Sequence, residues 1–169
     1  MENQDIQKTL ILFKPDTLQR GLVGEILTRF ERVGLKIVAT KMLAPDKAHY
    51  FKHYEEIGKM VTRRGEQAFN VALEMMVQGP VIAMVLEGVE AIALVRKLVG
   101  PTEPKSASPG TIRGDYSHMS FGYADQKNIG IPNLIHASGD LEDAQQEIKH
   151  WFRDEELYDY QALHEKFTR

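Results

Sequence analysis

The sequence predicts a single α+β domain built as an α/β sandwich, with helices packed on one face of a β-sheet. Two short apolar runs, at 9–13 and 80–86, have the length and composition of buried strands. Segments with helical spacing of apolar residues alternate with strand-like segments along the chain, the pattern of layered folds. The 169 residues, 43% of them apolar, fit one domain over 1–169, without a linker or an internal repeat.

The first half of the chain is predicted to alternate strands with helices. The strand at 9–13 ends at Lys14-Pro15-Asp16, and apolar residues then recur with helical period until Gly34 stops the helix. Pro45 suits the first turn of a later helix. A basic stretch at 59–64 links that helix to the next. The expected elements are a strand at 9–13, a helix at 22–33, a strand at 35–43 and helices at 45–57 and 66–77.

The second half is predicted to hold the most irregular segment. More than thirty residues after Gly100 are rich in Pro, Gly and Ser and show little regular periodicity. Loops of that length inside a compact domain are usually functional or variable insertions. The expected elements around it are a strand at 80–86, a helix at 89–99, a short strand at 133–136 and a helix at 140–151, followed by an irregular tail.

Composition narrows the classes of function. Acidic and basic side chains nearly balance, giving a formal net charge of -3 and no global basic field for nucleic acid. The absence of cysteine excludes disulfides, thiolate metal sites and cysteine nucleophiles. The N-terminus lacks the pattern of a secretory leader, and no stretch approaches the roughly 18 apolar residues of a membrane span. We expect a cytoplasmic protein with no membrane role and no primary nucleic-acid role.

Polar side chains follow several predicted strands and helices, where a rigid scaffold would hold them still. Lys14 directly follows the first strand, and Asn133, His136 and Ser138 lie along the last one. Side chains two apart in an extended segment point to the same face, so Ser138 is expected on the His136 side. The remaining candidates before and within the long loop are Arg96, Thr102 and Arg113.

The helix after His136 offers that histidine a partner. Leu141, Ala144, Ile148 and Trp151 form its apolar stripe, and Glu147 lies beside the stripe. A carboxylate at the edge of a core is costly unless it finds a partner. His136, at the mouth of the same strand-turn-helix unit, is the natural one. A carboxylate that fixes the orientation and tautomer of an imidazole makes the other ring nitrogen a better nucleophile.

Each candidate also has an ordinary structural explanation. A histidine at a strand end is often structural, Arg96 and Arg113 suit surface charges or ion pairs, and Lys14 suits a surface lysine. His49 and His53 stand four apart on a predicted helix without a third metal ligand, so we assign them a structural or surface role. If the candidates meet in space, they form a polyanion site for which phosphate is the obvious ligand. No P-loop or GxGxxG motif is present, so a nucleotide would bind by other means.

Four blocks of the sequence resemble the signature blocks of nucleoside diphosphate kinases, in the same order and over nearly the whole chain. The last block contains His136 and is the most specific of the four. The blocks are KPDTLQRGLVGEIL at 14–27, GPVIAMVLEG at 79–88, PGTIRGD at 109–115 and NLIHASGD at 133–140.

The resemblance implies a ferredoxin-like βαββαβ core with an antiparallel sheet and additional helices. It implies an enzyme that moves a terminal phosphoryl group from a nucleoside triphosphate to a nucleoside diphosphate, through a phosphohistidine at His136 and with ping-pong kinetics. Mg²⁺ would arrive on the nucleotide phosphates rather than on protein ligands. The chain would form a homo-oligomer, a hexamer or a tetramer.

The resemblance also implies roles for individual residues. Lys14 and Asn133 match positions that contact the nucleotide sugar, with Lys14 also near the transferred phosphate. Ser138 and Glu147 match groups that position the histidine. The remaining matches, to the phosphate-binding and catalytic set, are Tyr54, Arg96, Thr102 and Arg113.

Three departures from the family pattern affect this reading. Alignment back from Gly79 places Ala68 where the family has a base-stacking Phe, so we expect Phe69 to stack on the base, with Val71 or another group as the alternative. About ten extra residues fall within 118–132, and Phe121, Tyr123 and Ile129 there favour a lid or an oligomer contact over an inert loop. The histidine block reads HASG instead of His-Gly-Ser-Asp, so Gly139 removes an acidic side chain, and Asp140 is left to cap the next helix.

Other functions remain open beside the transferase. A phosphohistidine protein kinase, or a nucleotide sensor that has lost turnover, would share the same residues. A nucleic-acid-binding or regulatory module is a second class, which the charge balance and the absence of an aromatic-basic surface pattern make a poor primary function.

Overall fold

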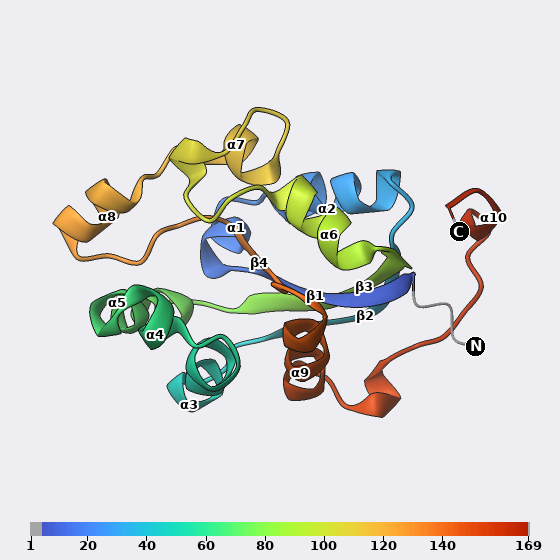
Figure 1. Cartoon of the computed structure of the whole chain (residues 1–169), viewed down its shortest axis with the longest axis horizontal. Helices are drawn as coiled ribbons and strands as arrows, with labels where there is room; N and C mark the ends of the chain where they lie inside the picture. Colours follow the sequence, from blue (N-terminus) through green and yellow to red (C-terminus); the bar gives the residue numbers. More distant parts are fainter. Residues whose placement is uncertain (1–4, 169) are drawn as a thin grey trace.

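The computed structural model describes residues 5–168; the outermost residues of the predicted 1–169 domain, 1–4 and 169, lie outside the described residues. Four strands form one antiparallel sheet in the order β2-β3-β1-β4, with helices on both faces (Figure 1). The order confirms the predicted α+β class and the ferredoxin-like core. The strands are β1 Ile6–Phe13, β2 Lys36–Leu43, β3 Val81–Val89 and β4 Ile135–Ala137.

The helices are short, and in the described residues none combines the length and the apolar character needed to cross a membrane. They are α1 Pro15–Gln19, α2 Val23–Arg32, α3 Lys47–Phe51, a π-helix Lys52–Ile57, α4 Met60–Arg64, α5 Glu66–Met76, α6 Ala91–Val99, a 3₁₀ helix Pro104–Ser106, α7 Ile112–Tyr116, α8 Phe121–Lys127, α9 Leu141–Trp151, a 3₁₀ helix Asp154–Glu156 and α10 Glu165–Thr168.

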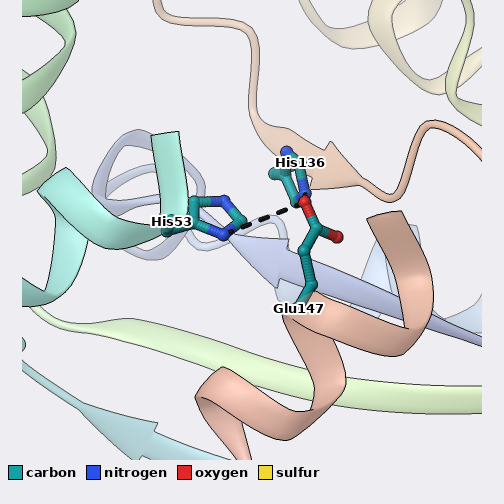
Figure 2. A group of neighbouring side chains, drawn as sticks. All are labelled: His53, His136 and Glu147. Carbon is teal, nitrogen blue, oxygen red and sulfur yellow. Dashed lines mark hydrogen bonds and ion pairs between the residues drawn. The ribbon is translucent and has the colours of Figure 1, made fainter. Parts of the chain in front are cut away.

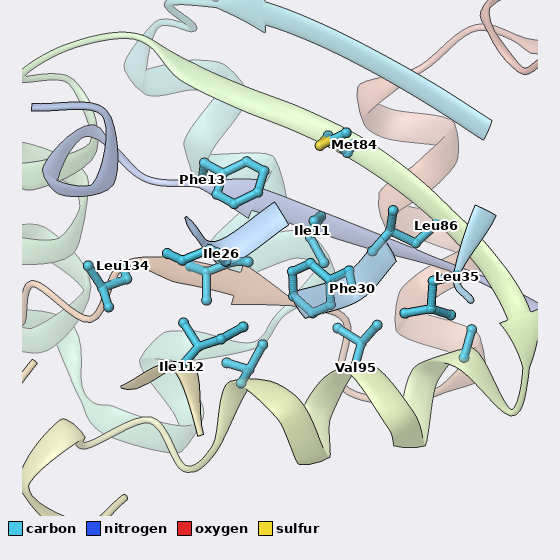
Figure 3. Close-up of a cluster of buried hydrophobic side chains, with 13 residues drawn as sticks. Ile11, Phe13, Ile26, Phe30, Leu35, Met84, Leu86, Val95, Ile112 and Leu134 are labelled. Carbon is cyan, nitrogen blue, oxygen red and sulfur yellow. The ribbon is translucent and has the colours of Figure 1, made fainter. Parts of the chain in front are cut away.

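Two apolar clusters cover the two faces of the sheet. Along β1, Ile11 and Phe13 point to one face and meet α2 and α6, as the core in Figure 3 shows. Leu10 and Leu12 point to the other face, toward α3 and α9. This alternation follows from the two-residue repeat of a strand. The expectation that helices lie on one face is wrong, because β1 is apolar at every position from Leu10 to Phe13 and must be covered there on both sides.

Several local predictions also need correction. The basic link at 59–64 is largely the helix α4, and the long irregular loop contains α7 and α8. Helices of five to seven residues are too short for an apolar periodicity to be visible in the sequence. On α9, Leu141 lies outside the predicted apolar stripe, because as the first residue after the Asp140 N-cap it packs in neither apolar cluster and leaves 51% of its surface exposed.

Candidate active site

A cavity of about 270 Å³ opens where β1 ends and β4 begins, bounded by the π-helix, α5 and α8. It brings together residues that are far apart in the sequence. Ser138 lies buried behind His136, while Phe69 lies outside the cavity lining. The predicted site residues that line the cavity are Lys14, Tyr54, Arg96, Thr102, Arg113, Asn133, His136 and Glu147.

His136 is held from behind by a buried carboxylate. Its Nε2 atom lies 2.8 Å from Oε1 of Glu147, whose side chain is 3% exposed. The Ser138 hydroxyl donates to the other oxygen of Glu147 at 2.6 Å, and its Oγ accepts the Leu10 amide at 3.1 Å. Both oxygens of the carboxylate are therefore engaged, and β1 fixes Ser138 in turn. The partnership predicted from the edge of the α9 stripe is present.

This arrangement distinguishes the two nitrogens of the His136 ring. Glu147 already accepts a hydrogen bond from the Ser138 hydroxyl, and an ionised carboxylate can only accept, so it acts as an acceptor toward Nε2 as well. Nε2 then carries the ring proton, and Nδ1 keeps its lone pair. In Figure 2 the second nitrogen of His136 points away from Glu147. A lone pair on a fixed imidazole at the wall of a cavity is a nucleophile.

His53 is a neighbour of this pair that sequence reasoning left in a structural or surface role. Its ring meets that of His136 at a centroid distance of 4.5 Å, and its Nδ1 lies 3.8 Å from Glu147 Oε1 (Figure 2). Trp151 donates to that Nδ1 at 3.2 Å. Burial, and then the proximity of the His136 ring, hold the pKa of His53 well below its usual value, so the His53 ring is neutral. No sequence spacing signals the contact, since His53 and His136 come from separate elements.

Two imidazoles and a carboxylate within 4.8 Å of one another are also a possible ligand set for a transition metal. In this cluster, however, the lone pair of His53 Nδ1 already accepts the Trp151 N–H. A metal at that nitrogen would have to displace the indole donor. Hydrogen bonding therefore accounts for the cluster without a metal. We assign His53 and Glu147 the role of orienting the His136 ring.

Lys14 and Asn133 form the part of the wall beside His136. The Lys14 ammonium donates to Asn133 Oδ1 at 2.7 Å, and the Asn133 amide donates to the Thr102 carbonyl at 2.8 Å. Burial, and then the charge of Arg113, lower the pKa of Lys14 to about 8. A buried cation without a carboxylate bound to it is destabilised, and an incoming anion would relieve that cost.

Arg113 is both part of the cavity wall and part of the frame of β4. Its guanidinium donates to three backbone carbonyls, those of Asn133 at 3.1 Å, Gly100 at 3.0 Å and Ile135 at 2.5 Å. Burial, and then the nearby Arg96, lower the pKa of Arg113 to about 10, which leaves it charged at neutral pH. Arg96 itself is exposed on α6. The cavity therefore combines a guanidinium held by backbone carbonyls with an exposed one.

Tyr54 adds a neutral donor to this end of the cavity. Its hydroxyl is buried and has no hydrogen-bond partner among the described residues. Burial raises the pKa of Tyr54 above its usual value, so the hydroxyl keeps its proton. An unpartnered buried hydroxyl is costly. A phosphate oxygen in the cavity would supply the missing acceptor.

The opposite end of the cavity is largely apolar and lies between α5 and α8. Val71 and Met75 line it from α5, and Phe121 and Ile129 line it from the inserted segment. The Arg64 guanidinium lies over the Phe121 ring, 4.1 Å from its centroid. The insertion at 118–132 therefore forms a wall of the cavity.

Phe69, predicted to stack on the base, packs elsewhere. It is buried against Phe51, with a centroid distance of 5.7 Å. On α5, Ala68 and Ala72 face the cavity instead, because residues four apart share a helix face. An alignment that is uncertain by one residue cannot choose between two neighbours that point to different sides of a helix.

Comparisons with known proteins point to one family. The family profile described as nucleoside diphosphate kinase matches residues 7–157. A nucleoside diphosphate kinase of Borreliella burgdorferi is 50% identical over 155 residues, covering 92% of each chain. One of Pyrococcus furiosus is 43% identical, covering 98% of this chain and 94% of its own.

Solved structures show the same likeness. A transition-state mimic of the Borrelia burgdorferi enzyme with bound vanadate and ADP superposes with a TM-score of 0.94, at 48% identity and 97% coverage of both chains. A halophilic enzyme from Halobacterium salinarum in complex with CDP gives a TM-score of 0.81 at 37% identity, covering 95% of this chain and 97% of that one. With the profile, the relatives and the fold in agreement, the chain belongs to the nucleoside diphosphate kinase family.

Proposed function

We propose that this member of the family transfers the terminal phosphoryl group of a nucleoside triphosphate to a nucleoside diphosphate through a phosphohistidine on Nδ1 of His136. The observation that carries the proposal is the pairing of His136 Nε2 with the buried Glu147, which leaves Nδ1 unprotonated at the wall of a cationic cavity. The relatives bound to ADP with vanadate and to CDP support nucleotides as ligands.

The transfer takes place in two matching steps. The Nδ1 lone pair attacks the terminal phosphorus, the bond from that phosphorus to the bridging oxygen breaks, and the nucleoside diphosphate leaves with the electron pair. A second nucleoside diphosphate then attacks the phosphohistidine with a terminal phosphate oxygen, and the P–N bond breaks toward Nδ1. One cavity serves both steps, which gives ping-pong kinetics.

The residues around His136 stabilise the charge that develops on the phosphoryl oxygens. Lys14, Arg96 and Arg113 supply positive charge, and the Tyr54 hydroxyl supplies a neutral donor without another partner. Because Arg113 and Lys14 are already held by β4 and Asn133, they need little reorganisation when charge develops. Glu147 stabilises the imidazole in the reactive tautomer, and Ser138 fixes Glu147.

The donor set of the cavity fits Mg²⁺ that is held by the nucleotide. Its lining carries the carboxylates of Asp125, Asp143 and Glu147, and both oxygens of Glu147 are engaged. Mg²⁺ usually keeps several waters and binds one or two carboxylates together with substrate phosphates. When bound, the ion would offset phosphate charge beside Lys14 and Arg113. We therefore propose Mg²⁺ as the metal, without a set of protein ligands dedicated to it.

The apolar end of the cavity is the proposed site of the base. The surfaces of Val71 and Met75 on one side and Phe121 on the other offer contact without a defined set of hydrogen-bonding groups. Contact by shape and dispersion accepts purines and pyrimidines alike. We propose that Phe121, and not Phe69, replaces the base-stacking Phe of the family, and that the enzyme therefore accepts several bases.

The oligomeric state, the compartment and the substrates are proposed from the family. We propose a homo-oligomer, a hexamer or a tetramer, working in the cytoplasm on nucleoside di- and triphosphates. The aromatic residues exposed near the C-terminus, Tyr158 and Phe167 among them, support an interface between copies. Sedimentation of the purified protein distinguishes a hexamer from a tetramer directly.

The test of the proposed function is transfer of label in two stages. The protein is mixed with Mg²⁺ and γ-labelled ATP, freed of nucleotide, and examined for a label that is labile in acid and stable in base. It is then chased with GDP or CDP. We expect label on the wild type that moves to either acceptor, and none on a His136→Ala variant.

His118→Ala is the matched control for the histidine variant. His118 is exposed and lies outside the cavity lining, so its loss should leave both the label and the chase unchanged. A wild-type protein that binds ATP yet takes no label would contradict the proposal and favour a nucleotide sensor. Label that survives His136→Ala would contradict the assignment of the nucleophile.

A further inference from the structure

The backbone two residues before His136 is strained. Leu134 has φ = +74°, a left-handed conformation that a bulky side chain rarely adopts. The Ile135 amide donates to the Asn133 carbonyl at 2.9 Å, so residues 133–135 form a γ-turn around Leu134. Leu134 is completely buried. Strain of this kind persists only where the surroundings hold it, and it concentrates at functional sites.

Three groups from the segment that follows β1 hold this turn. The Leu134 amide donates to Asp16 Oδ2 at 3.0 Å. The Leu134 carbonyl accepts the Lys14 amide at 2.9 Å and also the Thr17 hydroxyl. Both polar groups of the Leu134 backbone are therefore bonded to residues 14–17. Without the Asp16 carboxylate, a buried N–H would lose its acceptor, and the strained turn would lose a main reason to form.

The turn connects the two sides of the active site. On its C-terminal side, the γ-turn determines where β4 begins and therefore the direction in which His136 points. Upstream it places Asn133, whose side chain accepts the Lys14 ammonium at 2.7 Å. Asp16 does not line the cavity that holds His136, but its charge partly offsets the lowering of the pKa of Lys14 and of Arg113. A substitution that removes the charge and keeps the acceptor therefore isolates the effect that passes through the backbone. A small change in the turn would move the nucleophile and the cation relative to each other.

We propose that Asp16 is a positioning residue for phosphoryl transfer: by accepting the Leu134 amide it keeps the γ-turn at 133–135 and thereby aims His136 at the phosphoryl group. The inference rests on the proposed function of His136. Arg113 also binds the carbonyls on either side of Leu134, but it lines the cavity as well, so its substitution cannot separate positioning from charge. Asp16 allows that separation.

The test compares Asp16→Ala with Asp16→Asn and with a matched carboxylate elsewhere. Asn keeps an oxygen that accepts the Leu134 amide, while Ala does not. Asp46 accepts the His49 amide at 2.8 Å at the start of α3, outside the cavity lining, so Asp46→Ala removes a bond of the same kind. For each protein we would measure the single-turnover rate of His136 labelling, the dissociation constant of ADP and the melting temperature.

We expect Asp16→Ala to slow labelling by roughly tenfold to a hundredfold, the size expected when a reacting group is misplaced by about 1 Å. ADP affinity should change by less than about threefold, because the cavity cations remain. Asp16→Asn should restore most of the rate. Asp46→Ala should lower the melting temperature by about 2–4 °C, as Asp16→Ala does, and leave the labelling rate unchanged.

Two kinetic results would overturn the proposal. If the Asp16→Ala variant is labelled at the wild-type rate, the hydrogen bond between Asp16 and the Leu134 amide does not aim His136. Asp16→Asn that fails as badly as Asp16→Ala shows that the negative charge, and not the hydrogen bond, matters. Hydrogen exchange at the Leu134 amide tests the structural step without any transfer: protection should fall in Asp16→Ala and persist in Asp16→Asn. A wild type without label contradicts the proposed function alone, and unchanged protection in Asp16→Ala contradicts this inference alone.

Discussion

The two ends of the cavity are built in different ways. At the phosphate end, His136 is paired with Glu147, and Ser138 connects that carboxylate to the Leu10 amide of β1. Arg113 donates to the backbone carbonyls of Asn133 and Ile135. At the base end, Val71, Met75 and Phe121 offer apolar surface from two helices that are linked to the sheet by loops. Hydrogen-bond partners fix the side chains at the first end, while the second end is defined by the shape of its apolar surfaces.

The difference suits what each end must do. Phosphoryl transfer requires charges within a fraction of an ångström of their best positions, and a rigid buried network supplies that precision. A base that needs only to be held, and that varies between substrates, is served by surfaces that tolerate adjustment. Substitutions at the phosphate end should therefore reduce the rate of transfer, and those at the base end should weaken binding.

The largest effect is expected from Arg113→Ala, because this side chain serves both the chemistry and the frame. Removing a donor to the developing charge should slow transfer by roughly 10²–10³-fold. Three backbone carbonyls would also lose their donor, at about 1–3 kcal/mol for each that stays buried. We expect a melting temperature lower by about 10 °C, measured by calorimetry beside the transfer rate.

Arg96→Ala is the control that separates these two roles. Arg96 is exposed on α6, and no hydrogen bond from its side chain to the backbone is found within residues 5–168. Its loss should slow transfer while the melting temperature stays within about 1 °C of the wild type. If both substitutions lowered the melting temperature equally, Arg113 would not stabilise the fold more than Arg96 does.

The next effect in size is expected from Glu147→Gln, which tests whether the buried carboxylate sets the tautomer of His136. Both Ser138 and His136 donate to Glu147, and a Gln side chain can accept from only one of them with its oxygen. The amide nitrogen then faces the other donor, which favours the tautomer with the proton on Nδ1. We expect labelling to slow by roughly a hundredfold with little change in ADP affinity.

Nitrogen NMR of the His136 ring gives an independent measurement of the same prediction. The wild type should show the proton on Nε2, and Glu147→Gln should show a larger share on Nδ1. A variant with an unchanged tautomer and a slow rate would mean that Glu147 acts by charge on the transition state instead.

Much of the phosphate end could be predicted from the sequence, and the reason is chemical. Glu147 stands at the edge of an apolar helix stripe, and a carboxylate there needs a partner such as His136. The contact at 2.8 Å follows from that rule. His53 gave no such signal, because its partners come from β4 and α9, and only the tertiary fold brings the three elements together.

The base end could be predicted only in outline. The apolar residues of the 118–132 insertion indicated a contact, but α8 is a seven-residue helix, too short to be seen from periodicity. Phe69 and Ala68 are neighbours in sequence and point to different sides of α5, so a resemblance that is uncertain by one residue selects the wrong side chain. Apolar surfaces are interchangeable in a way that a hydrogen-bonded network is not.

A smaller effect, confined to binding, is expected from Phe121→Ala. Loss of the aromatic wall should raise KM for nucleoside diphosphates by roughly tenfold and leave kcat within about twofold, since stacking contributes about 1–1.5 kcal/mol. Phe69→Ala is the matched control: Phe69 is buried outside the cavity, so its loss should lower stability by about 3–5 kcal/mol without a change in KM. If Phe69→Ala raised KM while Phe121→Ala did not, the base would lie elsewhere.

The smallest effect is a loss of affinity with pH that arises at the phosphate end. Burial and the charge of Arg113 lower the pKa of Lys14 in the free enzyme to about 8. The protonated lysine attracts the phosphates, so its contribution is nearly complete at pH 7 and below and is lost as pH rises through 8. With nine-tenths of Lys14 protonated at pH 7 and about a quarter at pH 8.5, ADP should bind roughly fourfold more weakly at the higher pH.

Calorimetric titration of ADP between pH 7 and 9.5 measures this loss, and Lys14→Met provides its control. The variant should bind more weakly at every pH and lack the midpoint near 8, because Met cannot titrate. Binding that stays constant to pH 9.5 in the wild type would show that bound phosphate does not depend on Lys14. The description of this end as a set of fixed charges would then rest on Arg113. A midpoint that remained in Lys14→Met would assign the titration to another group. Base-end substitutions such as Phe121→Ala should leave the midpoint where it is, since apolar contacts carry no proton.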